Sequence, residues 1–167
     1  MKLAYNILRL LRPRQWIKNL AIFAAITFFF AVAVSAHEMA TKAEQAVGYR
    51  HGLYGAIAWN FGPINAMAQG KAPYDKNAVI IRSARVAALA EMLPEAFPEG
   101  SAIKGKSEAK PAIWEHRAEF DALLKKFSEK AQLLSDGAKS GDFEKVKVLT
   151  LDMRAVCKEC HEKYKED

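Results

Sequence analysis

Near its C-terminus the chain contains the segment Cys157-Lys158-Glu159-Cys160-His161, whose spacing constrains how the remaining sequence can fold. This is the Cys-x-x-Cys-His pattern of a haem c attachment site, in which two thiols form thioether bonds to the haem and the imidazole binds its iron. In a helix, residues three and four positions apart lie on one face. The motif therefore predicts one haem c, covalently attached through Cys157 and Cys160 on a helix, with His161 as proximal iron ligand.

Three other uses of this cysteine pair fit less well. The sequence has no further cysteine. A disulfide between adjacent helical turns closes almost no loop and stabilises little, and a thioredoxin-like dithiol is expected beside a β-α-β pattern that is not apparent here. A structural zinc site needs about four ligands, whereas His37, His51 and His116 are scattered singly along the sequence.

Composition indicates an all-α protein. Ala, Leu, Lys and Glu are abundant, and runs of β-branched residues with a period of two are scarce. A chain of 167 residues can bury a sizeable core in one domain.

The net charge of +6 does not indicate a nucleic-acid partner. Residues 1–36 contain five Lys or Arg and no acidic residue, which leaves 20 basic and 19 acidic residues in the rest of the chain. Because the remainder is nearly neutral, a basic surface for nucleic acid is not expected.

The N-terminus has the pattern of a secretory signal peptide. Residues 1–18 are basic, and residues 19–36 form an apolar run that ends in Val34-Ser35-Ala36, with small residues at positions −3 and −1 of the expected cleavage site. We expect cleavage after Ala36 and export to the periplasm, leaving residues 37–167 as the mature domain. The apolar run is also long enough to approach a membrane span, so an uncleaved anchor is the alternative.

Helical periodicity predicts four helices in the mature domain. The first is expected from Met39 to Met67, with Gly62-Pro63 kinking or interrupting it. The second starts after Asp75 as N-cap and stops at Pro94. A long surface connection covers residues 94–110, held in place by Phe97 or Ile103.

The third and fourth helices carry the clearest apolar stripes. Pro111 suits the first position of the third helix, which ends near two glycines, and its core side chains repeat every seven residues: Ile113, Phe120, Phe127 and Leu134. Asp142 is expected to cap the fourth helix, which places Cys160 on its inner face. The predicted fold is an antiparallel four-helix bundle with covalently bound haem.

These motifs together resemble the cytochrome c-prime family, over about residues 43–165. The resemblance rests on AVGYR at 46–50, GKAPYD at 70–75, PAIW at 111–114 and CKECHEKY at 157–164. It implies a four-helix bundle with one C-terminal haem c. It also implies that Arg50 neighbours a haem propionate and that Tyr54 faces the iron from the distal side.

The identity of Tyr54 is informative, because family members with a methionine at this distal position are six-coordinate electron carriers, and Tyr54 is not a methionine. We therefore expect a five-coordinate iron that binds small gases such as NO or CO. Two alternatives remain open for Tyr54: ligation of ferric iron as a tyrosinate, and ordinary core packing with the distal position one turn away.

Lys165 is a second departure, since many relatives carry an arginine on the proximal side. Lysine is a more mobile point charge, so proximal gas binding is expected to differ. The resemblance also implies a homodimer through the first two helices. Trp59 and Trp114 are expected to pack, and His51 and His116 to be exposed.

Gas binding is thus the first functional hypothesis. Electron transfer with an unidentified redox partner is the second. Enzymatic activity, as NO reduction or weak peroxidase chemistry, is ranked last because no catalytic acid or base can be assigned beside the iron.

Overall fold

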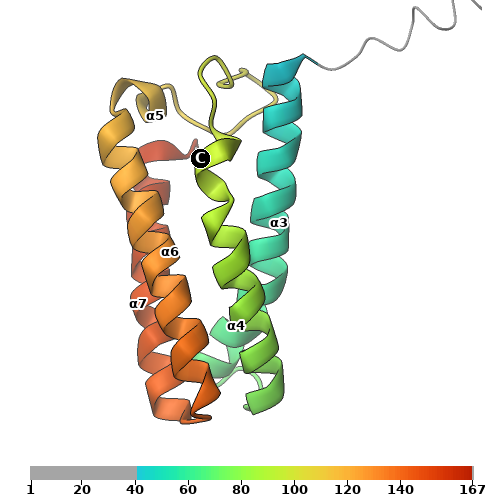
Figure 1. Ribbon diagram of the computed structural model, residues 1–167, viewed down its shortest axis with the longest axis vertical. Coiled ribbons are helices and arrows are strands. Elements are labelled where there is room, and N and C mark those ends of the chain that lie inside the picture. Colours follow the sequence, from blue (N-terminus) through green and yellow to red (C-terminus); the bar gives the residue numbers. More distant parts are fainter. Residues whose placement is uncertain (1–40, 167) are drawn as a thin grey trace, which may run out of the picture. The chain divides into compact units, whose positions relative to one another are not determined.

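Four long helices lie side by side in the computed structural model, which describes residues 41–166 (Figure 1). They are α3 (Lys42–Ala68), α4 (Lys76–Glu91), α6 (Arg117–Lys139) and α7 (Phe143–Tyr164). Across this part of the chain the only strand-like pairing is an isolated bridge between Ala109 and Lys165. The predicted all-α bundle is confirmed, whereas the predicted leader lies outside the described residues.

Side-chain caps mark the starts of α3, α4 and α7. Thr41 and Glu44 form a capping box, so α3 begins at Lys42 rather than at the predicted Met39. Asp75 and Asp142 accept backbone hydrogen bonds at the starts of α4 and α7, as their sequence positions predicted. No helix within residues 41–166 has the length and hydropathy needed to cross a membrane.

Pro63 does not interrupt the first helix, because α3 continues through it to Ala68. A proline lacks the N–H that would bind the carbonyl four residues earlier, which here belongs to Trp59. The Arg82 guanidinium, on α4, donates to this Trp59 oxygen at 3.0 Å. A neighbouring helix thus supplies the hydrogen bond that the proline removes.

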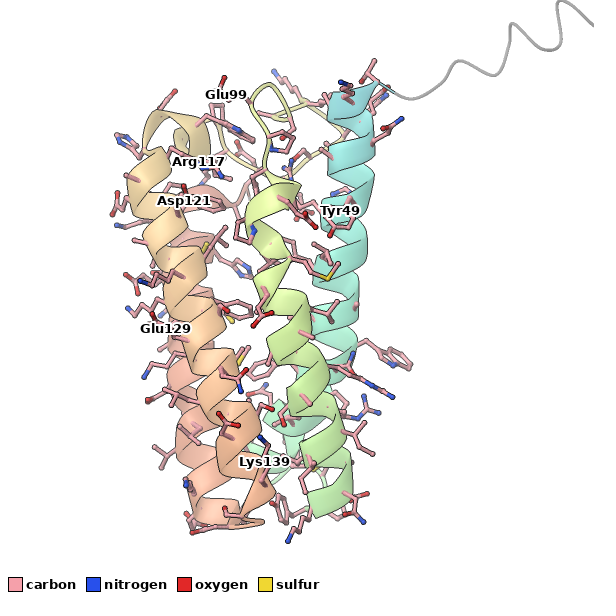
Figure 2. All side chains as sticks on the ribbon, viewed as in Figure 1. Tyr49, Glu99, Arg117, Asp121, Glu129 and Lys139 are labelled. Carbon is pink, nitrogen blue, oxygen red and sulfur yellow. The ribbon has the colours of Figure 1, made fainter. Side chains whose placement is uncertain are left out.

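The predicted third helix is divided in two. A short helix, α5 (Ala112–Glu115), is separated from α6 by His116, whose φ of −118° and ψ of 45° are not helical. The break accompanies two contacts with the preceding connection: Trp114 Nε1 donates to Pro98 O at 2.9 Å, and Arg117 Nη1 donates to Phe97 O at 2.6 Å. Arg117 lies at this end of α6 in Figure 2.

The connection between α4 and α5 closes the end of the bundle where α7 finishes. It starts with a 3₁₀ turn, η1 (Leu93–Ala96), followed by Phe97, which is 3% exposed and anchors the loop as predicted. Its far end pairs with the C-terminal residues, since Lys110 N donates to Tyr164 O at 3.0 Å and Glu166 N donates to Glu108 O at 2.7 Å.

The core follows the predicted apolar stripes. All four residues of the seven-residue repeat are buried, and Val146, Met153 and Val156 of α7 are buried with them. Burying such a side chain stabilises the fold by about 1.5–3 kcal/mol. The prediction that Trp59 packs in the core is wrong, because its side chain projects from α3 and is 75% exposed.

The hydrogen bond from Arg82 generates a prediction for stability. Arg82→Met should lower the free energy of unfolding by about 1 kcal/mol, because the Trp59 carbonyl loses its donor. In a Pro63→Ala background the new N–H can bind that carbonyl, so the same substitution should cost less than half as much. Urea unfolding followed by circular dichroism measures both effects as a double-mutant cycle.

Arg85→Met is the matched control, since Arg85 is an exposed arginine on α4 and makes no hydrogen bond or ion pair with any residue in the range 41–166. It should change stability little in either background. An equal cost for Arg82→Met with and without Pro63 would contradict the explanation.

Candidate functional site

A cavity of about 410 Å³ lies in the half of the bundle that contains the end of α7. The lining residues come from α3, α6 and α7 and from the connection between α4 and α6. Of the long helices that contact one another, α3 and α7 pack least closely. Its walls are mainly apolar and include Ile57, Phe61, Phe97, Phe120, Phe127 and Val156. A cavity of this size and polarity suits a largely apolar ligand.

The three residues of the C-terminal motif all line this cavity. Cys157 and Cys160 are unpaired thiols, partly buried on the last turns of α7. Burial raises the pKa of each thiol to about 11, so both stay protonated at neutral pH. Partial desolvation lowers the pKa of His161, with the charge of Lys165 acting in the same direction, which favours the neutral imidazole that binds metals.

Tyr54 lines the cavity from α3 and lies near the two cysteines. Its ring meets Phe97 edge to face, with ring centroids 6.3 Å apart. Burial raises the pKa of Tyr54 well above its usual range. The side chain predicted to be distal is therefore on the cavity wall, as a neutral phenol.

Arg50 is buried, at 4% exposure, and is held by neutral groups of the connecting loop. Its Nε donates to Ala96 O at 3.2 Å, Nη1 to Ser107 Oγ at 2.9 Å, and Nη2 to Ser101 Oγ at 2.8 Å and Ser101 O at 3.3 Å. The guanidinium also lies 4.4 Å from the centre of the Phe97 ring. Burial lowers the pKa of Arg50 without neutralising so strong a base.

This buried cation has no acidic partner among residues 41–166. A guanidinium has five N–H donors, and these contacts leave at least one N–H of Nη1 free. Since a buried charge is costly without a counter-ion, and Arg50 lines the cavity, the site favours a ligand with an anionic group near Arg50.

Lys165 also lines the cavity, but a carboxylate from the connecting loop holds its ammonium group. Lys165 Nζ lies 3.0 Å from Glu108 Oε2, and Glu108 is itself a lining residue. The hydrogen bond and charge of Lys165 lower the pKa of Glu108. The lysine, expected to be mobile, is thus paired at the edge of the site.

Together these residues fit a haem. The walls are apolar, and two thiols and one imidazole project from a single helix face. The buried guanidinium of Arg50 favours an anionic group on the ligand. Cys157 and Cys160 would hold the macrocycle, and His161 would bind its iron. Arg50 would face a propionate, with Tyr54 on the opposite wall from α7.

Comparison with known proteins agrees with this geometry. The family model of cytochrome c' matches residues 45–165. A cytochrome c' from Rubrivivax gelatinosus is 38% identical over 125 residues, covering 75% of this chain and 97% of the relative. The chain belongs to the cytochrome c' family.

Solved cytochrome c' structures have the same fold. That of the protein from Shewanella frigidimarina is 38% identical, with a TM-score of 0.73, and the match covers 77% of this chain and 99% of that one. A nitric oxide complex of a cytochrome c prime variant from Alcaligenes xylosoxidans is 30% identical, with a TM-score of 0.70 and coverage of 76% and 98%. Members of the cytochrome c' family are haem proteins, and the cysteine pair of this chain matches covalent haem c.

Sequence reasoning missed several residues that shape the site. Ser101 and Ser107, the hydroxyl partners of Arg50, lie in a polar loop and carry no periodic signal. Glu108 and His51 line the cavity, although both are exposed and were not assigned to it. His51 directly follows the AVGYR segment at 46–50, and this position next to Arg50 is the one signal in the sequence that could have identified it.

Proposed function

We propose that this cytochrome c' family member is a periplasmic gas-binding protein whose haem iron is five-coordinate. His161 supplies the single protein ligand to the iron, and the side facing α3 is open to NO or CO. The observation that carries this proposal is Tyr54, a non-methionine side chain on the cavity wall contributed by α3.

The electrostatics of Tyr54 support an open site over tyrosinate ligation. Its pKa is raised chiefly by burial, so ionisation at neutral pH is unfavourable. A neutral phenol is a weak ligand for iron compared with the phenolate. Tyr54 would then act as a bulky neutral gate whose ring restricts the space beside the iron.

Each remaining site residue has a distinct task in this proposal. Cys157 and Cys160 carry the thioether bonds, and Arg50 neutralises a propionate while ordering the loop. Lys165, paired with Glu108, closes the edge near His161 rather than covering the imidazole. When bound, haem supplies an iron that coordinates small diatomic gases.

The relatives support NO as the ligand class. The Alcaligenes xylosoxidans protein is described in a nitric oxide complex, and it shares the fold over nearly its full length. Electron transfer is the alternative, and it requires a sixth ligand or an efficient redox partner that nothing in the site identifies. Catalysis ranks below both. His51 and Glu108 line the cavity, but neither is assigned as a catalytic acid or base beside the iron.

Location and processing follow from the leader. We infer that residues 1–36 direct export and are removed, because haem c attachment by this motif is expected in the periplasm. N-terminal sequencing of the protein from the periplasmic fraction should begin at His37. Recovery of an intact N-terminus in the membrane fraction would instead support the anchored form.

We also propose a homodimer through α3 and α4. Trp59 is 75% exposed and Ile81 is 52% exposed, and the hydrogen bond from Arg82 to Trp59 O joins these parts of the two helices. Large apolar side chains gathered on one face mark interaction surfaces. This face belongs to the two helices that the family resemblance assigns to the dimer.

Gas binding is tested by absorption spectroscopy of the purified holoprotein. The ferrous wild type should bind CO promptly, and Tyr54→Ala should increase the association rate at least tenfold by removing the ring. Tyr54→Met should give a low-spin spectrum and slower CO binding, because methionine can occupy the sixth position. Tyr54→Phe, which keeps the ring, is the matched control. A low-spin spectrum of the wild type that CO does not change would contradict the proposal.

The dimer is tested by sedimentation equilibrium. Trp59→Lys should weaken association about 30-fold, the effect of losing roughly 2 kcal/mol at a tryptophan hot spot. Leu133→Lys is the control, since Leu133 is 51% exposed on α6 and lies outside the proposed interface. Equal association constants for wild type and Trp59→Lys would contradict this assignment.

A further inference from the structure

The ring of Tyr54 is positioned by packing and not by a hydrogen bond. The other tyrosines between residues 41 and 166 each hydrogen-bond through their hydroxyl groups, and these are Tyr49, Tyr74 and Tyr164. The Tyr54 hydroxyl has no such partner in this range. The neighbours of its ring therefore decide where the side chain lies in the cavity.

Phe97 is the aromatic neighbour of Tyr54. The two rings meet at an interplanar angle of 72°, with their centroids 6.3 Å apart, which is the edge-to-face arrangement that aromatic pairs favour. Within the described part of the chain, no other aromatic ring pairs with Tyr54. Phe97 is 3% exposed and also lines the cavity. It belongs to the loop after α4, so a loop residue supports a side chain of α3.

The backbone around Phe97 is held at three successive carbonyl groups. Side chains of α3, α5 and α6 each donate to one of them: Arg50 to Ala96 O at 3.2 Å, Trp114 to Pro98 O at 2.9 Å and Arg117 to Phe97 O at 2.6 Å. Hydrogen bonds to charged donors are stronger than those between neutral groups. Three helices thus fix the point from which the Phe97 side chain projects.

The Phe97 ring is held as well as its backbone. The Arg50 guanidinium lies 4.4 Å from the ring centre, within the range of a cation–π contact. Phe120, from α6, meets the same ring edge to face, with centroids 4.7 Å apart. Because Phe97 has these fixed neighbours and Tyr54 has no hydrogen bond, Phe97 is the rigid member of the pair.

We propose that Phe97 is a positioning residue that keeps the Tyr54 ring in the space beside the iron and thereby slows gas entry. The proposal rests on the gas-binding site of the proposed function and deepens it, because it assigns control of the Tyr54 gate to the connecting loop. A smaller side chain at position 97 leaves unfilled space beside Tyr54, into which the Tyr54 ring can turn.

Flash photolysis of the ferrous CO complex tests the proposal as a double-mutant cycle. Phe97→Leu should raise the CO association rate about fivefold, because the Tyr54 ring is no longer held in place. In a Tyr54→Ala background the same substitution should change the rate by less than about twofold, because no ring remains to be positioned. Equal increases in both backgrounds would overturn the proposal, since Phe97 would then act on gas entry without Tyr54.

Phe127→Leu is the matched control. Phe127 is 7% exposed and lines the same cavity, but it makes no ring contact with another aromatic residue in the range 41–166. Its substitution should alter the CO association rate by the same factor with and without the Tyr54 ring. Coupling as strong as that of Phe97 would overturn the proposal, because any enlargement of the cavity would then suffice.

The infrared C–O stretching band of the CO complex reports the position of Tyr54 independently of the rate. Phe97→Leu should shift or broaden this band, because the Tyr54 hydroxyl dipole moves relative to the bound gas. In a Tyr54→Phe background, which lacks the hydroxyl, the same substitution should change the band much less. An unchanged band in Phe97→Leu would overturn the proposal.

Two further precautions keep the outcomes distinct. Phe97→Met is made in parallel, with the same expected results, so that a folding failure of Phe97→Leu does not decide the test. The absorption spectrum of each protein is recorded first. A wild type that does not bind CO would refute the proposed function, whereas a wild type that binds CO without coupling between Phe97 and Tyr54 would refute this inference alone.

Discussion

The structure depends on the helical geometry of one turn of α7. Cys157, Cys160 and His161 can act on one ligand only because a helix places them on the same face, and that face must meet a cavity rather than a packed core. The looser packing between α3 and α7 provides that space. The tightly packed side chains elsewhere in the bundle hold α3 and α7 apart, so the core of one half of the molecule supports the cavity of the other.

A buried charge organises the edge of this cavity. Arg50 is costly to bury, and its hydrogen bonds to Ala96, Ser101 and Ser107 offset that cost while fixing a long connection that has little regular structure. The same loop carries Glu108, which holds Lys165. Order in the loop, the charge of Arg50 at the cavity and the position of the C-terminus are therefore linked, and a change at one is expected to alter the others.

The strongest local signals in the sequence predicted the fold well. The seven-residue repeat through Phe120 and Phe127 and the N-cap at Asp142 identified buried faces and helix starts, because both depend on residues close in sequence. Pro63 misled for the opposite reason: its cost is offset by Arg82, on another helix, which no local pattern reveals. Thr41 and Glu44 could have been recognised as a capping box, since their spacing is visible in the sequence.

The residues of the site also divide into those that a local sequence pattern reveals and those that depend on contacts between distant segments. The cysteine and histidine motif and the resemblance around Arg50 identified residues that do line one cavity, whereas the ion pair of Lys165 with Glu108 joins segments far apart in sequence and could not be foreseen. The central claim is that the iron has one protein ligand. Resonance Raman spectroscopy of the ferric and ferrous holoprotein at neutral pH tests it most directly: we predict five-coordinate, high-spin haem with histidine as the axial ligand in both states, and a six-coordinate, low-spin signature in the ferrous protein would contradict the account.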